Sequence, residues 1–272
     1  MTGIYVHVPF CVSKCPYCDF YSLPLAAVDA DMRKRYAAAV VREMERYDGV
    51  FADTLYFGGG TPSLLGGKAL TAVIAAARKR FSLSDDAEVT LEANPADDLY
   101  ETLSAFAAAG GNRLSLGMQA SSSDRLKTLG RRHTPHDVAR TVADARRAGI
   151  ENISLDLMLA VPGQDAAAVT ADVETCAALG VQHVSAYLLK IEEGTPFEKL
   201  RDTLSLPDDD TAAELYLAAV AALERAGFAQ YEISNFAKPG FESRHNLKYW
   251  TGAPYLGFGP AAHSLSLIHI SE

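Results

Sequence analysis

The stretch YVHVPFCVSKCPYCDF runs from Tyr5 to Phe20 and places three cysteines at CxxxCxxC spacing, at Cys11, Cys15 and Cys18. The cysteines directly follow a short apolar run that predicts a β-strand. Cysteine thiolates are soft ligands, and they are the groups that hold iron–sulfur clusters. Because a cubane cluster has one iron at each metal corner, three thiolates leave one iron open to a small molecule.

Zinc binding and simple burial are the alternatives for these cysteines. A structural zinc site takes four ligands, usually as two close pairs, whereas this segment holds a single group of three, to which His7 could add a nitrogen. A disulfide is disfavoured because closely spaced, odd-numbered cysteines without a signal peptide indicate metal binding. The fourth cysteine, Cys176, lies far away in a helical pattern, where a packed core thiol is expected. The spacing therefore favours an iron–sulfur cluster over zinc.

The composition indicates a globular protein with a sizeable core. The chain has 272 residues, is 49% hydrophobic and carries a formal net charge of −9. No basic stripe is visible, which argues against nucleic acid as the main partner. The N-terminus lacks a signal-peptide pattern, and no apolar run reaches the roughly 18–20 residues of a transmembrane segment. We expect a cytoplasmic location, since a reducing compartment suits an oxygen-sensitive cluster.

Short apolar runs alternate with amphipathic helical patterns over the first 190 residues. Six strand–helix repeats of this kind predict an α/β fold with a parallel sheet, although periodicity does not distinguish a doubly wound sheet from a barrel. Beyond them we expect a loop over 192–206, a helix capped by Asp208, and a strand over 231–236. The expected parallel strands are Ile4–Val8, Thr54–Phe57, Val89–Glu92, Arg113–Gly117, Ile153–Met158 and His183–Leu189.

Polar residues stand where these strands end, which is where functional groups collect in parallel α/β folds. The second strand leads into Gly58-Gly59-Gly60-Thr61, whose glycines allow a ligand to approach the backbone closely. The third strand ends at Glu92, and the fourth leads into Gln119. Asp156 lies inside the apolar fifth strand, where an ionised side chain is costly unless paired. A structural salt bridge is the alternative to a ligand contact there.

The strand followed by CxxxCxYC resembles the signature of radical S-adenosylmethionine (SAM) proteins. The longer pattern YxHxPFCxxxCxYCxF resembles the oxygen-independent coproporphyrinogen III oxidase-like family, in particular its HemW-type heme-chaperone branch. This resemblance implies a partial (β/α)6 TIM-like barrel over residues 1–190 and an extension over 191–264 that leads into a further C-terminal domain. It also implies a [4Fe-4S] cluster whose open iron is chelated by SAM.

The resemblance further implies which residues form the SAM and cluster pocket. The glycine loop matches the GGGTP motif that contacts the methionine moiety of SAM, and Asp156 matches a contact to the SAM ribose. Arg131 would pair with the SAM carboxylate, although Arg132 is adjacent and could take that place. The implied residues are Tyr5, His7, Tyr17, Gly58, Gly59, Gly60, Thr61, Glu92, Gln119, Arg131 and Asp156, beside the cluster ligands Cys11, Cys15 and Cys18.

Two functions are compatible with the resemblance. The segment HNLKYW, starting at His245, matches the HNxxYW motif of the chaperone branch, and histidine is a common axial ligand of heme iron. We therefore expect a chaperone that binds heme, with His245 as a candidate ligand, and passes it to an acceptor hemoprotein. Phe20 stands where oxidase-branch members carry an additional cysteine. The alternative is an oxygen-independent coproporphyrinogen III dehydrogenase, which converts propionates to vinyl groups. A radical SAM enzyme on another substrate and a zinc-stabilised binding protein are weaker alternatives.

The final octapeptide, LSLIHISE over residues 265–272, resembles a translated sequencing adapter. We expect the native sequence to depart from this chain after about Ser264, and we assign no function to His269.

Overall fold

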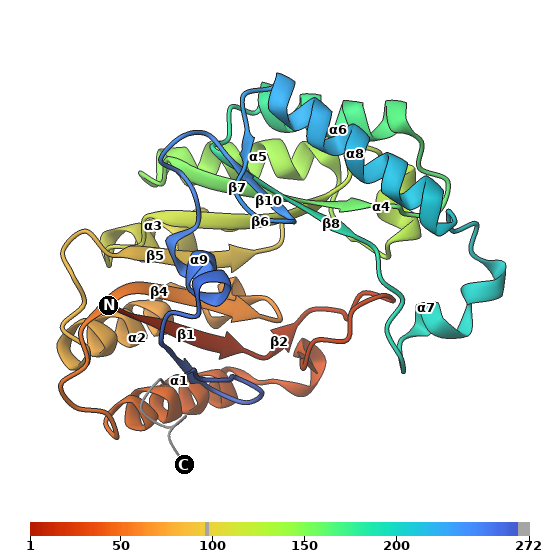
Figure 1. Ribbon diagram of the computed structural model, residues 1–272. Coiled ribbons are helices and arrows are strands. Elements are labelled where there is room, and N and C mark those ends of the chain that lie inside the picture. The colour runs from red at the N-terminus through yellow and green to blue at the C-terminus, as the bar shows by residue number, and fades with distance from the viewer. Residues whose placement is uncertain (96–97, 266–272) are drawn as a thin grey trace, which may run out of the picture.

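The computed structural model describes residues 1–95 and 98–265, which form one curved sheet covered by helices on its outer face (Figure 1). The sheet order is β11-β1-β4-β5-β6-β7-β8-β10-β9. Its six central strands run parallel in chain order, so the predicted parallel α/β fold is confirmed. They are β1 (Thr2–Val8), β4 (Ala52–Gly59), β5 (Glu88–Ala93), β6 (Arg113–Gln119), β7 (Asn152–Leu159) and β8 (His183–Leu188).

The sheet stays open, because no pairing joins its two edge strands in the part of the chain that the structure describes. One edge is β11 (Tyr255–Phe258), which runs parallel to β1. At the other edge, β10 (Asn235–Ala237) pairs antiparallel with β8 and with β9 (Ala229–Gln230). A separate two-stranded ribbon joins β2 (Phe10–Cys11) to β3 (Leu23–Pro24).

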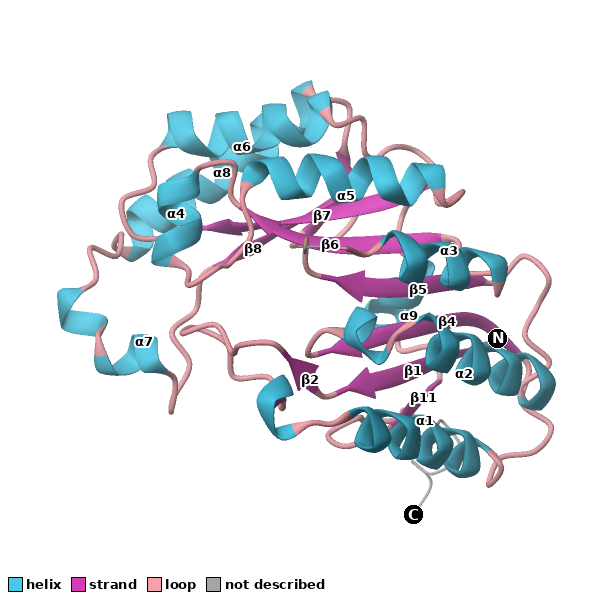
Figure 2. Cartoon of the chain, turned by 180° about the vertical axis from the view of Figure 1, so that it is seen from behind, coloured by secondary structure: helices cyan, strands magenta, loops and turns pink. Residues whose placement is uncertain are grey.

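Helices of the strand–helix–strand crossovers cover the outer face of the sheet (Figure 2). Their starts follow from local capping: the Asp29 side chain accepts from the Met32 amide, and Thr134 and Asp137 form a reciprocal capping box. The long helices are α1 (Ala30–Met44), α2 (Gly67–Arg80), α3 (Tyr100–Ala108), α5 (Pro135–Arg147), α6 (Ala166–Ala178) and α8 (Asp209–Arg225). Shorter ones are η1 (Leu25–Ala27), η2 (Pro62–Leu65), α4 (Ser123–Thr128), α7 (Pro196–Lys199), η3 (Arg201–Thr203) and α9 (Arg244–Thr251).

The two faces of the sheet differ in polarity. Strand residues alternate between faces, and in β4 the side chain of Phe57 contacts Phe106 of α3, on the helix-covered side. Thr54 and Tyr56, on the opposite face, instead hydrogen-bond to His245 and Glu92. The concave face therefore presents polar groups to the space that it encloses. Other buried polar side chains on the strands are Glu88, Thr90, Arg113, Ser115, Ser154, His183 and Ser185.

Two expectations for the C-terminal third were wrong. The segment 192–206 is not a plain loop, since it contains α7 and η3, and Thr195 caps α7 by accepting from the Glu198 amide. The strand expected over 231–236 is reduced to β10, because the chain turns before it: the Tyr231 amide donates to the Asn235 carbonyl. Most of the octapeptide 265–272 lies outside the described residues, and the further C-terminal domain stays a prediction. Among the described residues, no helix is long and apolar enough to cross a membrane.

Candidate functional site

Cys11 ends the short strand β2, and Cys15 and Cys18 lie on the loop that follows it. All three are free thiols and partly exposed, and a turn brings the Cys18 amide to the Cys15 carbonyl at 3.1 Å. Burial raises the pKa of the Cys18 thiol, and the neighbouring Cys15 and Cys11 thiols raise it further. In the described ranges, no three metal-binding side chains converge closely enough to hold a single ion.

The glycine loop after β4 fits closely against the cysteine loop. A β-carbon on Gly59 would lie 2.8 Å from the His7 ring, and one on Gly60 would lie 3.0 Å from the Cys11 sulfur. The Gly60 and Thr61 amides donate to the Val8 and Phe10 carbonyls at 2.9 and 2.7 Å. Small residues are therefore required here, since any side chain would push the loop away from Cys11. This fit, together with the three soft thiol donors, matches what an iron–sulfur cluster needs.

A chain of polar contacts links the cysteine loop to the ends of β5 and β6. The Cys11 sulfur lies 3.8 Å from Thr61 Oγ1, which accepts from Asn94 Nδ2 at 3.0 Å. Arg131 Nη1 donates to Asn94 Oδ1 at 2.8 Å, and its Nε donates to the Tyr17 hydroxyl at 3.1 Å. Arg131, rather than Arg132, is thus the arginine that lies in the site. Asn94 is the centre of this network, although no sequence motif selects it by itself.

Gln119 ends β6 in a strained conformation. Its φ is +66°, in the left-handed region that non-glycine residues seldom adopt. A β-carbon on Gly117 would lie 2.9 Å from Asn94 Oδ1 and 3.0 Å from Gln119 Nε2, so this glycine makes room for both amides. The buried ring of His133 bonds to the Met118 carbonyl at 3.1 Å and steadies the turn. In this conformation the side-chain amide of Gln119 lies beside the contact between Asn94 and Arg131.

Two carboxylates project from the concave face of the sheet. Glu92 Oε1 accepts from the Tyr56 hydroxyl at 2.7 Å, and Asp156 Oδ1 accepts from Ser115 Oγ at 3.2 Å. Burial among protein atoms raises the pKa of Glu92 to about 7, and the nearby charge of Asp156 adds to this shift. Burial also raises the pKa of Asp156. Both side chains are half-buried, and Glu92 lines the cavity described below. Asp156 forms no ion pair within the described residues, so the salt-bridge alternative finds no partner there.

His245 lies in the interior, on α9. It is fully buried, its Nδ1 bonds to Thr54 Oγ1 at 2.8 Å and its Nε2 bonds to the Tyr249 hydroxyl at 2.9 Å. The ring stacks on Tyr56 with a centroid distance of 5.0 Å. Burial, with the positive charges of Lys248 and Arg113, lowers the pKa of His245 to about 3, which keeps the imidazole neutral. Both ring nitrogens are therefore occupied in this conformation.

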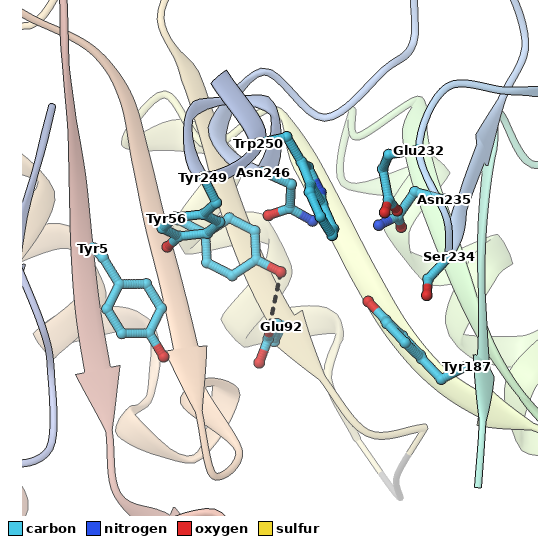
Figure 3. Close-up of a pocket in the computed structure, with 10 residues that line it drawn as sticks. All are labelled: Tyr5, Tyr56, Glu92, Tyr187, Glu232, Ser234, Asn235, Asn246, Tyr249 and Trp250. Atoms are coloured by element: carbon cyan, nitrogen blue, oxygen red, sulfur yellow. Dashed lines mark hydrogen bonds between the residues drawn. The ribbon is translucent and has the colours of Figure 1, made fainter. Parts of the chain in front are cut away.

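A cavity of about 360 Å³ joins these elements between β1, β4, β5, β8 and α9 (Figure 3). An adjoining cavity of about 400 Å³ shares Tyr5, Glu92 and Tyr249 with it and reaches His7 and Gly59. The HNLKYW helix thus lines one connected region with four of the predicted SAM-pocket residues, Tyr5, His7, Gly59 and Glu92. The others lie outside the lining of these two cavities: Tyr17, Gly58, Gly60, Thr61, Gln119, Arg131 and Asp156. The sequence did not single out several of its wall residues, which become neighbours only through the fold: Tyr56, Tyr187, Glu232, Ser234 and Asn235.

Comparisons with known proteins agree with this arrangement. The family model described as the radical SAM superfamily matches residues 5–176. The heme chaperone HemW of Mycobacterium tuberculosis is 42% identical over 267 residues, which cover 96% of this chain and 68% of that protein. The bovine radical S-adenosyl methionine domain-containing protein 1, mitochondrial, is 40% identical over 96% of this chain and 60% of its own length.

The solved structures show the same fold. The coproporphyrinogen III oxidase HemN of Escherichia coli, described as a radical SAM enzyme, superposes with a TM-score of 0.82 over 97% of this chain and 64% of that chain, at 22% identity.

A further sequence relative, the HemW of Escherichia coli, is 37% identical over 96% of this chain and 69% of that protein. The motif spacing, the order of the parallel strands and these relatives agree, and the chain belongs to the radical SAM superfamily and, within it, to the HemW family.

Proposed function

We propose that the protein is a heme chaperone, which binds heme beside a SAM-ligated [4Fe-4S] cluster and passes the heme to an acceptor hemoprotein. One observation carries the proposal: the HNLKYW helix lines the same cavity as two of the predicted SAM residues. Tyr5 and Glu92 share its wall with Asn246, Tyr249 and Trp250. A ligand on α9 would therefore lie next to a ligand held by the strand ends.

In this proposal Cys11, Cys15 and Cys18 hold the cluster, and the residues at the strand ends hold SAM. Arg131, fixed by Tyr17 and Asn94, is placed to pair with a carboxylate. Asp156 offers its second carboxylate oxygen to ribose hydroxyls, with Ser115 holding the first. When bound, the reduced cluster supplies the electron that cleaves SAM in this superfamily. The protein's own part is to orient both groups and to exclude water.

We assign the heme contacts to α9, because this helix carries both exposed aromatic side chains and the candidate iron ligand His245. Trp250 is 61% exposed and Tyr249 is 42% exposed, so a flat apolar ligand can stack against them. Ligation of iron by His245 through Nε2 would require the Tyr249 hydroxyl to leave that nitrogen. We place this activity in the cytoplasm, where a reducing environment preserves the cluster.

The test is an anaerobic heme titration of the cluster-reconstituted protein, followed at the Soret band. We expect stoichiometric binding by the wild type and weaker binding by His245→Ala, with His136→Ala as the control because His136 is exposed and lies on α5. Transfer to an apo-hemoprotein is measured next, as a Soret shift in the acceptor. Absence of heme binding would contradict the proposal and favour coproporphyrinogen III dehydrogenase activity, which is assayed with coproporphyrinogen III and SAM as vinyl product formed.

A further inference from the structure

One wall of the cavity holds hydrogen-bond acceptors that no described residue satisfies. This wall is formed by the turn before β10, with Glu232 and Asn235, and is shown in Figure 3 opposite Tyr5. Both carboxylate oxygens of Glu232 and Oδ1 of Asn235 are buried and have no hydrogen-bond partner among the described residues. Asn235 is only 4% exposed, so open solvent does not explain its orientation.

Such a group of acceptors is unfavourable unless a donor reaches it. A buried polar atom without a partner destabilises a fold, and native structures contain few of them. Here three lie on one cavity wall, within four residues of one another in the chain. A ligand that carries several N–H donors would satisfy them together.

The remaining lining of the cavity favours a cation. Two carboxylates face the cavity, from Glu92 and Glu232, and the described residues that line it include no lysine, arginine or histidine. Arg113, which is buried in β6, makes no ion pair with either glutamate in the described ranges. The aromatic rings of Trp250 and Tyr187 extend into the cavity from α9 and β8 (Figure 3). Aromatic faces together with carboxylates are the surroundings in which organic cations bind.

We propose that this wall binds the guanidinium group of a ligand. A guanidinium presents parallel N–H donors that match a carboxylate in a two-point contact, and its planar face stacks on aromatic rings. Glu232 accepts the two-point contact, Asn235 Oδ1 accepts a third donor, and Trp250 or Tyr187 covers the face. A volume of about 360 Å³ leaves room for a side chain as long as that of arginine. The site shares the cavity and Trp250 with the proposed heme contacts, but it goes beyond that function because Glu232 and Asn235 take no part in the heme or SAM proposal.

The chain supplies its own reporter for this site. Trp250 is the only tryptophan in the sequence and lines the cavity, so the intrinsic fluorescence reports on this wall alone. The cluster-reconstituted full chain is titrated with agmatine and with N-carbamoylputrescine, which has the same length but a neutral urea in place of the guanidinium. We expect saturable change in Trp250 emission with agmatine and at least tenfold weaker binding of the urea compound.

Two variants connect the signal to the wall. Glu232→Gln preserves the shape but removes the charge and is expected to weaken agmatine binding at least tenfold, while Glu193→Gln, an exposed glutamate outside the cavity lining, leaves it unchanged. Asn235→Ala serves as the second variant if Glu232→Gln fails to fold. Equal affinity for agmatine and its urea analogue, or unchanged affinity in both variants, would overturn the proposal. Heme binding is measured separately at the Soret band. Failure of agmatine to bind therefore does not contradict the heme proposal, and failure of heme to bind does not contradict the guanidinium site.

The source of the guanidinium is decided by a further pair of probes. Agmatine represents a free small molecule, and the capped tripeptide acetyl-Gly-Arg-Gly-amide represents an arginine on a partner protein. Tighter binding of agmatine indicates a small-molecule ligand, and tighter binding of the tripeptide indicates an arginine side chain inserted by a protein. Either result supports the site, whereas saturation by neither overturns it.

Discussion

Asp156 shows how a single residue can indicate a ligand. Its carboxylate lies on the concave face, accepts a hydrogen bond from Ser115 and forms no ion pair in the described ranges, although the positive charges of Arg113 and Arg131 act on it from nearby. Burial raises its pKa, which means that the charged form is held at a free-energy cost. A polar ligand with hydroxyl donors would offset that cost. This agrees with the expectation that Asp156 binds the SAM ribose.

We predict that Asp156→Ala weakens SAM binding by roughly 1–3 kcal/mol, because a hydrogen bond to a charged group is lost. The measurement is isothermal titration of SAM into the cluster-reconstituted protein. The same substitution at Asp210, which is exposed in the first turn of α8, is the control and should leave SAM affinity unchanged. A folded Asp156→Ala protein with wild-type affinity would exclude this residue from the SAM site.

At the residue scale, the sequence predicts those site residues whose types are fixed by chemistry. Cysteines at CxxxCxxC spacing and a carboxylate within an apolar strand are recognisable from the order of residues alone. Asn94 and Glu232 are not, because asparagine and glutamate are common at strand ends and turns. Asn94 is important through its contact with Arg131, and Glu232 through the cavity wall that it forms with residues distant in the chain, such as Tyr5. No local pattern encodes such a contact.

At the scale of elements, the glycine loop after β4 positions the cysteine loop. A β-carbon on Gly60 would lie 2.7 Å from the Phe10 carbonyl oxygen and 3.0 Å from the Cys11 sulfur. The first of these atoms is backbone, so it cannot move without displacing β2. The loop and β2 are also held by the Thr61 amide, which donates to the same carbonyl.

We therefore predict that Gly60→Ala displaces β2 and reduces cluster incorporation several-fold. Iron content and visible absorption after anaerobic reconstitution measure this loss. Gly149→Ala is the control, since open space surrounds Gly149 and only its φ of +91° adds strain there. If Gly60→Ala takes up as much iron as Gly149→Ala, the close fit does not determine cluster binding.

Helix α5 and strand β10 show why one element was predicted correctly and another was not. The start of α5 follows from Thr134, Pro135 and Asp137, which cap the helix with each other. In contrast, β10 owes its position to antiparallel pairing with β8, a partner about 50 residues earlier. The sequence before it, Tyr231–Ser234, has strand-forming residues but turns instead, because its backbone groups bond to Asn235 and to β8.

At the scale of the whole molecule, α9 connects the end of the described chain to its beginning. The Arg244 and His245 amides donate to the Glu88 carboxylate at 3.0 Å, as expected for an acid at a helix N-terminus. Lys248 forms an ion pair with Asp53 at 2.7 Å and donates to the Met1 carbonyl. The helix that carries the proposed heme contacts is thus attached to the first strands of the sheet, so its position depends on the fold as a whole.

Two buried groups contribute to the pH dependence of stability with opposite sign, beside Asp156, whose pKa burial raises, and His183, whose pKa burial lowers. The pKa of Glu92 is about 7 in the folded protein against an ordinary value of 4.5, so its carboxylate destabilises the fold progressively as pH rises from 4.5 to 7. The pKa of His245 is about 3 against an ordinary value of 6.5, so the fold loses stability as pH falls from 6.5 to 3. Between pH 4.5 and 6.5 the two slopes cancel.

We therefore predict that Glu92 and His245 together add almost no pH dependence to the free energy of unfolding of the ligand-free protein between about pH 4.5 and 6.5, and that the His245 contribution lowers it below that window. Urea unfolding followed by circular dichroism measures it. In Glu92→Gln the acid that becomes charged is absent, so stability should keep rising to pH 6.5, with a gain over wild type on the order of 2 kcal/mol between pH 4.5 and 7. In His245→Gln the loss at low pH should shrink instead. Curves for both variants that run parallel to wild type would show that neither group titrates as its burial implies, and that the concave face is more open to water than its contacts indicate.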